Sequence, residues 1–153
     1  MDLAQDLRVP KENPKIYQSF WINAYNLCVI KGIVENYPVK SPLDVQGLFD
    51  KKIFIIGGEE RTLDEIENKL LRGNFPKESR FHFVLVCAGL GCPPIIDRAY
   101  LPSTLEVQLQ QQTKLSLNNP DFVRINGNKV LLSQIFEWCM NDFTKEGKSL
   151  VGS

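Results

Sequence analysis

The pattern of apolar and polar positions begins with one long helical segment. Residues 16–37, IYQSFWINAYNLCVIKGIVENY, place an apolar side chain at every third or fourth position, which predicts an amphipathic helix with one buried stripe. The expected members of that stripe are Phe20, Ala24, Leu27, Ile30 and Val34. Pro38 follows the segment and cannot continue a helix, so we expect the helix to end there.

Capping residues mark the start of shorter helices. A Ser or Thr side chain before an apolar run accepts a hydrogen bond from the first helical turn, and a Glu three residues later completes a capping box. This chemistry is present at Ser41, at Thr62 with Glu65, at Ser103 with Glu106, and at Ser133. It predicts helices from 42 toward 49, over 63–71, over 105–118 and over 134–143. In the third of these, Leu105, Leu109 and Leu117 are expected to point inward and the glutamines outward.

Strand patterns are interspersed with these helices. Residues 52–58, KIFIIGG, predict a strand that is closed by two glycines, and FVRINGNKVLL, residues 122–132, predicts a hairpin around an Asn-Gly-Asn turn. FHFVLV, residues 81–86, is apolar on both faces apart from His82, which is typical of a central strand. We therefore expect an α+β fold over the single domain 1–153, with helices packed on a small mixed or antiparallel sheet.

Composition argues against several classes of function. The chain has 153 residues, of which 43% are hydrophobic and 24% charged, with a formal net charge of zero, so it has no basic footprint for nucleic acid. No apolar run approaches the roughly 20 residues of a membrane span, and residues 1–14 lack the apolar core of a signal peptide. One histidine and four cysteines without a CxxC pair do not form a zinc ligand set, and we expect no metal and no cofactor.

Three stretches, SFWINAYNLCVIKGIVENYP, RTLDEIENKLLR and RFHFVLVCAGLGCPPIIDRAY, occur together with the tail QLQQQTKLSLNNP…NKVLLSQIFEWCMNDF. In this order they resemble the bacterial branch of domain-of-unknown-function family 547, over residues 16–143. The resemblance implies a fold similar to papain-like cysteine peptidases and export to a secreted or periplasmic location. It also implies that upstream helices of the full family domain are missing from this chain.

The resemblance carries over to individual residues. The matching motif positions are Trp21, Asn23, Tyr25, Asn26, Ile66, Glu67, His82, Cys87, Cys92 and Pro93. Many relatives place a histidine directly after the Ile-Glu pair, whereas this chain has Asn68 there.

A thiol nucleophile with an imidazole base is the sharpest interpretation of these positions. It assigns Cys87 as nucleophile, His82 as acid or base, and Glu67 with Asn26 as orienting groups. Asn23 and Cys92 are then binding residues, with Cys92 as the reserve thiol. Against this interpretation, a regular strand would hold the Cα atoms of positions 82 and 87 about 16 Å apart on opposite faces.

Structural roles remain open for the same residues. Cys87 could be a small buried hydrophobe or form a disulfide with Cys92, and His82 could hydrogen-bond a buried acid or a carbonyl. Asn23 and Asn26 share a helix face, where they could hold a neighbouring loop or line a polar pocket. The remaining expectations are that Glu67 pairs with Arg72 or Arg80 and that Phe20, Trp21, Trp138, Cys28 and Cys139 are buried.

Three function classes follow. The first is a cysteine-dependent, peptidase-like hydrolase that acts on an unknown peptide or small molecule. The alternative is a non-catalytic, exported binding or assembly module that retains the fold, which Asn68 favours. The third is a redox domain that uses Cys87 and Cys92, although C-x4-C is a weak redox signal. An oligomer is left open.

Overall fold

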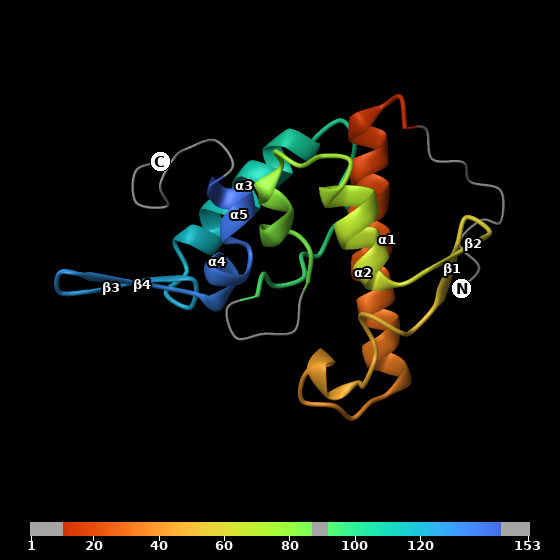
Figure 1. Cartoon of the computed structure of the whole chain (residues 1–153), viewed down its shortest axis with the longest axis horizontal. Helices are drawn as coiled ribbons and strands as arrows, with labels where there is room; N and C mark the ends of the chain where they lie inside the picture. The colour runs from red at the N-terminus through yellow and green to blue at the C-terminus, as the bar shows by residue number, and fades with distance from the viewer. Residues whose placement is uncertain (1–10, 87–91, 145–153) are drawn as a thin grey trace.

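The computed structural model describes residues 11–86 and 92–144 (Figure 1). Helices dominate the described residues, and two small antiparallel sheets accompany them, so the α+β class is confirmed. The strands form two separate two-stranded pairs rather than the single helix-covered sheet that the sequence predicted.

The longest element is α1, Pro14–Glu35. Asn13 caps it, because its side chain accepts a hydrogen bond from the Ile16 amide, and Pro14 occupies the first turn, where a missing N–H costs nothing. The helix is apolar around most of its circumference and is covered by η2 and α2 on one side and by η1 near its end. Its buried residues are Tyr17, Ser19, Trp21, Ile22, Ala24, Tyr25, Cys28, Val29 and Gly32.

The predicted stripe on α1 is therefore partly wrong. Ala24 is buried, but Leu27, Ile30 and Val34 are exposed. Two apolar stripes compete on this helix, and the stripe that contains the large aromatic side chains is the one that faces the core. Burying an aromatic ring removes more apolar surface from water than burying a leucine or valine does.

Two short elements follow α1. The 3-10 helix η1, Pro42–Asp44, begins at Ser41 with the predicted capping chemistry. The strands β1, Phe54–Ile56, and β2, Glu59–Arg61, pair antiparallel across the two glycines of the predicted strand end. Both glycines have positive φ angles, 60° and 78°, a conformation that side chains with a Cβ rarely adopt.

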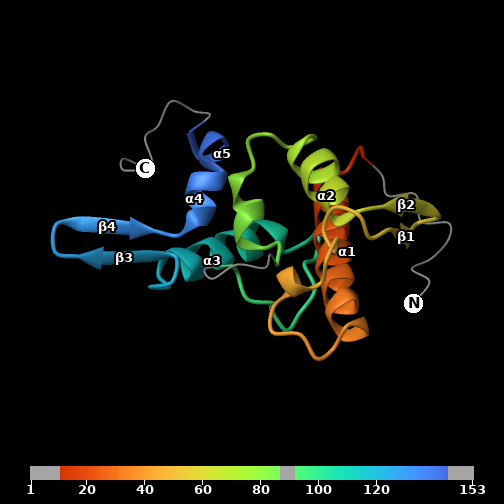
Figure 2. The ribbon, with the colours of Figure 1, turned by 60° about the horizontal axis from the view of Figure 1, so that its bottom comes forward.

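The predicted capping box at Thr62 and Glu65 is confirmed, but the helix that it begins changes type. One α-helical turn, α2 at Leu63–Glu65, continues as the π-helix η2 at Ile66–Arg72. Wide π-type turns are rare and are often found at functional sites. This segment lies alongside α1 in both ribbon views (Figures 1 and 2).

The predicted central strand at 81–86 is wrong. Residues Ser79–Phe83 form the 3-10 helix η3. Phe81 packs into the main core around α1, whereas Phe83 packs into a second cluster with Phe122, Ile135 and Phe136. In an extended strand, Phe81 and Phe83 would point to the same face. Their side chains enter two different clusters, which fits a compact helical turn.

Helix α3, Leu105–Leu117, lies between the two clusters and departs from its prediction in two ways. Its N-cap is Thr104 and no side chain caps it, so the expected capping box is absent. Leu105 and Leu109 are buried as expected, but Leu117 is exposed while Gln108 and Gln112 are buried.

The chain then forms the predicted hairpin and two short helices. β3, Val123–Asn126, pairs with β4, Lys129–Leu132, and α4, Gln134–Trp138, begins at the cap residue Ser133. α5, Met140–Thr144, completes the described chain. Trp138 is exposed, which contradicts its predicted place in the core. In both ribbon views the hairpin extends away from the helices (Figures 1 and 2).

Candidate functional site

A shared carboxylate joins three elements near the centre of the molecule. Asp142 Oδ2 on α5 lies 2.8 Å from Arg72 Nε on η2 and 2.9 Å from His82 Nε2 on η3. The side chains of His82 and Asp142 are 3% and 8% exposed, whereas that of Arg72, at 30%, reaches the surface. Hydrogen bonds in which the donor or the acceptor is ionised are stronger than neutral ones, so this cluster, which contains the guanidinium of Arg72, ties η2, η3 and α5 together.

The cluster extends to the position at which the family resemblance expects a histidine. Asn68 accepts a hydrogen bond from Arg72 Nη1 and donates one to Asp64, 2.8 Å away. A chain of polar contacts therefore runs from Asn68 through Arg72 and Asp142 to His82. Asn68 lies at the exposed end of this series of contacts, and His82 lies at its buried end.

Glu67 lies one position earlier on the π-helix and faces α1. Tyr25 donates its hydroxyl to Glu67 Oε2 over 3.5 Å, a long hydrogen bond. Burial raises the pKa of Glu67, and the positive charge of Arg72 only partly opposes that effect. Glu67 was expected to orient His82, but the carboxylate that contacts the imidazole here is Asp142.

Asn26 holds the backbone that follows η3. Its Nδ2 donates to the carbonyl of Val84 over 3.0 Å, and its Oδ1 accepts from the amide of Val86, also over 3.0 Å. One side chain thereby satisfies both a donor and an acceptor of a backbone stretch that forms no strand. Asn26 was expected to orient His82, but these two hydrogen bonds go to the backbone of Val84 and Val86 instead.

Asn23 makes the same kind of contact with a different segment. Its Nδ2 donates to the carbonyl of Tyr100 and its Oδ1 accepts from the Tyr100 amide, each over 2.8 Å. Gln108 on α3 holds the same segment from the other side, because it donates to Ala99 O and accepts from Leu101 N, each over 2.9 Å. This contact explains why Gln108 is buried.

These two asparagines also line a surface cleft of about 430 Å³ between α1 and residues 95–100. Leu27, Ile30 and Ile95 form an apolar part of its lining. Asp97 and Arg98 form the charged part. The sequence left two roles open for Asn23 and Asn26, holding a loop and lining a polar pocket. The structure supports the first role for both residues, and both also line the cleft, although its lining is mainly apolar.

The cysteines differ in state. Cys92 is disulfide-bonded, which removes it as a reserve thiol in this state, while Cys28 and Cys139 are free. Burial raises the pKa of Cys28 to about 11, and burial also raises the pKa of Cys139. Neither free thiol is therefore poised as a thiolate at neutral pH. Cys87, the expected nucleophile, lies outside the described residues.

Metal and membrane sites can be assessed over residues 11–86 and 92–144. Within these ranges, histidine, cysteine and acidic side chains do not gather in any group of three or more that could hold a metal ion. Over the same ranges, every helix falls short of the length and apolar character that a bilayer-spanning segment requires.

Two contributors were missed by sequence reasoning. Asp142 lies 60 positions from His82, and no local motif points to it. Gln108 follows the pattern of an outward polar residue, and only the fold of residues 99–101 makes it a buried hydrogen-bond partner.

A comparison with protein-family models matches residues 11–117 to the family described as "Protein of unknown function, DUF547". The matched range includes α1, η2, η3 and the cleft, whereas Asp142, the β3–β4 hairpin and the last two helices lie beyond it. Comparisons with curated proteins and with solved structures gave no match.

Proposed function

The chain belongs to the DUF547 family, as its motifs predicted, and we propose that it is a non-catalytic binding module whose ligand enters the cleft between α1 and residues 95–100. One observation carries this proposal. Asn23 and Asn26 line the cleft while each fixes a backbone segment with paired hydrogen bonds. Clefts of about 300–1,000 Å³ with a mainly apolar lining and a few fixed polar groups are typical of ligand sites.

The lining indicates the ligand's chemistry. Leu27, Ile30 and Ile95 would contact an apolar body. Arg98, whose guanidinium is 3.3 Å from Asp97 and highly exposed, would meet an anionic group at the rim. The ligand class is therefore a small amphipathic anion.

Anilinonaphthalene sulfonate, an apolar dye with one anionic group, is a suitable probe of the cleft. We expect saturable binding to the whole chain and at least a tenfold loss of affinity in Ile30→Glu, because a charge would be placed in the apolar wall. Val34→Glu is the matched control, since Val34 is exposed on the same helix one turn beyond the cleft. Equal dye affinity in both variants, with both folded, would rule out the cleft.

A hydrolase is the second candidate, and the His82–Asp142 pair favours it. In this scheme Cys87 is the nucleophile, His82 accepts its proton, and Asp142 holds the ring. The thiolate attacks an acyl carbonyl, the leaving group takes the proton from His82, and water then hydrolyses the thioester. This scheme agrees with the similarity to papain-like cysteine peptidases that the resemblance to the bacterial branch of the family implies.

The burial of His82 and the bonded state of Cys92 weigh against the hydrolase in this state. The hydrolase proposal can be tested by measuring the turnover of fluorogenic esters and peptides by the reduced chain. Turnover that disappears in Cys87→Ala and falls at least a hundredfold in Asp142→Asn would establish the enzyme. Absence of turnover across those substrates would leave the binding module.

We also propose that the chain works in an oxidising compartment, as a secreted or periplasmic protein. The disulfide at Cys92 supports this location, because disulfides persist mainly outside the reducing cytosol. Alkylation of free thiols at the moment of cell lysis, followed by reduction and a second, distinguishable alkylating reagent, would test the state of Cys92. A reduced Cys92 in freshly lysed cells would contradict the proposal.

A further inference from the structure

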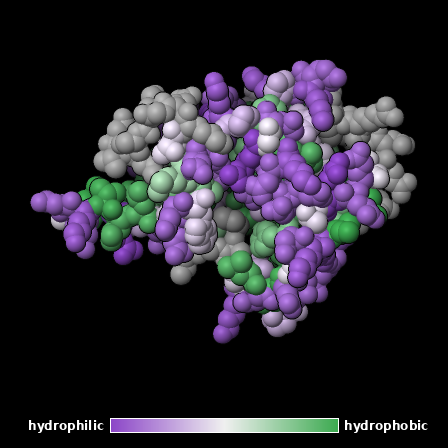
Figure 3. Space-filling model, in the orientation of Figure 1, coloured by the Kyte–Doolittle hydropathy of each residue, from purple (hydrophilic) through white to green (hydrophobic). Residues whose placement is uncertain are grey.

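The β3–β4 hairpin presents one apolar face to solvent. In an antiparallel pair, residues directly opposite each other lie on the same face, and the faces alternate along each strand. The register pairs Val123 with Leu132 and Ile125 with Val130, so these four side chains share a face. Ile125, Val130 and Leu132 are 77%, 56% and 42% exposed. Figure 3 shows hydrophobic side chains gathered over this hairpin.

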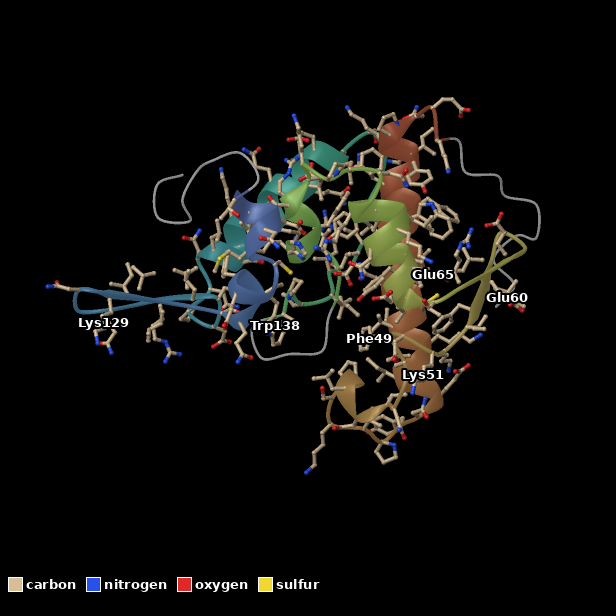
Figure 4. The ribbon with its side chains drawn as sticks, in the orientation of Figure 1. Phe49, Lys51, Glu60, Glu65, Lys129 and Trp138 are labelled. Carbon is tan, nitrogen blue, oxygen red and sulfur yellow. The ribbon has the colours of Figure 1, made fainter. Side chains whose placement is uncertain are left out.

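The opposite face carries positive charge. Arg124 pairs with Leu131, and Asn126 pairs with Lys129, so both basic residues lie on the face opposite the apolar one. Lys129 marks the tip of the hairpin, whereas Trp138 lies at its base (Figure 4). The described hairpin strands contain no acidic residue to offset these charges.

Some backbone groups of β4 point away from β3, toward the outer edge of the hairpin. The two-residue turn makes Asn126 and Lys129 a hydrogen-bonded pair, so the next pair, Ile125 and Val130, points its N–H and C=O groups outward. The hydrogen bond from Ser133 N to Phe122 O, 2.8 Å, fits this alternation.

The two edges of the hairpin are not equivalent. At the outer edge of β3, the amide of Val123 donates to Asn119 O over 3.0 Å. Over the part of the chain that the structure describes, no backbone hydrogen bond reaches the outward groups of Val130 or Leu132. Among the described residues, the outward groups of both Val130 and Leu132 on β4 are without a backbone partner, whereas at the edge of β3 the N–H of Val123 is already bonded, so the edge of β4 is the better site for a further strand.

We propose that the edge of β4 binds an extended strand of a partner protein whose residues alternate between apolar and acidic. A two-stranded hairpin is marginal in water, and a third strand would add backbone hydrogen bonds to it. The partner's apolar residues would extend the face of Val130 and Leu132, and its acidic residues would lie beside Lys129, with Arg124 one strand further away.

Self-pairing of the chain fits this edge less well. If β4 paired antiparallel with β4 of a second copy, the face-matching registers would place Lys129 opposite Leu131 or Ser133, and no acidic residue would meet the lysine. A lysine on an edge strand disfavours pairing with wholly apolar strands, whereas an acidic cross-strand neighbour stabilises it. Charge complementarity therefore favours a different protein, and not a second copy of the chain, as the partner that binds the edge of β4.

The test uses the whole chain and labelled synthetic peptides of about seven residues, the length of a typical strand. The probe alternates valine and glutamate. One control alternates valine and lysine, and the other keeps the probe's composition but groups its glutamates together. We expect the probe to bind about tenfold or more tightly than either control. A double charge reversal, Arg124→Glu with Lys129→Glu, should shift the preference to the lysine peptide.

A second variant pair tests the backbone contact. Val130→Pro removes an outward N–H without removing a hydrogen bond of the hairpin, and proline is tolerated at such edge positions. We expect Val130→Pro to lose probe binding about tenfold and Val130→Thr to retain it. Unchanged binding in Val130→Pro, or unchanged preference after charge reversal, would overturn the proposal. A dimer of the chain that Val130→Pro dissociates would also overturn it and assign the edge to a second copy.

Discussion

The imidazole of His82 and the carboxylate of Asp142 meet at 2.9 Å, although 60 positions separate them in the chain. The contact links a 3-10 helix in the family-matched region to a helix beyond it. It also explains why the chain's one histidine can be buried, because the ring has a charged hydrogen-bond partner.

Asp142→Asn tests how much this contact contributes to stability. Removing the charge weakens the hydrogen bonds to His82 and Arg72, and we expect a loss of about 2–4 kcal/mol of unfolding free energy. Urea unfolding measures it. Asp97→Asn, in an exposed ion pair with Arg98, serves as the control and should cost less than about 0.5 kcal/mol. Equal effects would show that the buried cluster contributes no more than a surface pair.

Asn26→Ala should be strongly destabilising. It would leave the carbonyl of Val84 and the amide of Val86 without their partner, a loss of about 2–3 kcal/mol. Asn36→Ala removes a single part-buried hydrogen bond, from an exposed side chain to Gly32 O at the end of α1, and should cost about 1 kcal/mol. Thermal and urea unfolding of both variants provide the comparison. A loss at Asn26 no larger than that at Asn36 would contradict its role in holding the backbone.

Glu67 should make stability depend on pH. Burial raises its folded pKa above the ordinary value of 4.5, so the folded state holds the proton more tightly than the unfolded state. The stabilising contribution is present below pH 4.5 and is lost as pH rises through the folded pKa. Relative to Glu67→Gln, the natural chain should therefore lose stability as pH rises above 4.5.

Urea unfolding of both chains from about pH 4 to pH 7 measures this difference. The two stability curves should converge at the acid end and separate toward neutral pH. Parallel curves would mean that the Glu67 carboxyl is hydrated like that of an unfolded chain.

The cysteines should react in a fixed order. In the native, unreduced protein, iodoacetamide should label Cys139 faster than Cys28, because Cys28 is buried and its pKa of about 11 leaves very little thiolate. Cys92 should stay unlabelled until a reductant is added. Peptide mass spectrometry assigns each site. Labelling of Cys92 without reductant would contradict its bonded state.

Some local signals in the sequence predicted local structure correctly, although the equally local capping box of Ser103 and Glu106 is absent. The capping box of Thr62 and Glu65 and the turn after Asn126 are confirmed, because each depends on residues within four positions of one another. The family resemblance likewise selected Asn23 and Asn26, and their paired backbone contacts confirm that they hold neighbouring segments.

The sequence could not predict what depends on distant partners. The run around His82 fits a strand by its apolar pattern, but Phe81 and Phe83 enter separate clusters that form only in the folded chain. Leu27 and Ile30 fit a buried stripe, yet the competing stripe with Trp21 and Tyr25 faces the core. A pattern on one helix does not reveal which of two apolar faces its neighbours will cover.

The central claim is that the polar motif residues maintain the fold and its cleft rather than perform catalysis. The pH dependence of iodoacetamide reaction at Cys87 in the reduced chain tests it most directly. If these residues are structural, the reactivity of Cys87 should rise with pH as that of an ordinary thiol does and should be unchanged in Asp142→Asn. Reactivity that persists in acid and is lost in folded Asp142→Asn would reveal an activated thiolate and contradict the account.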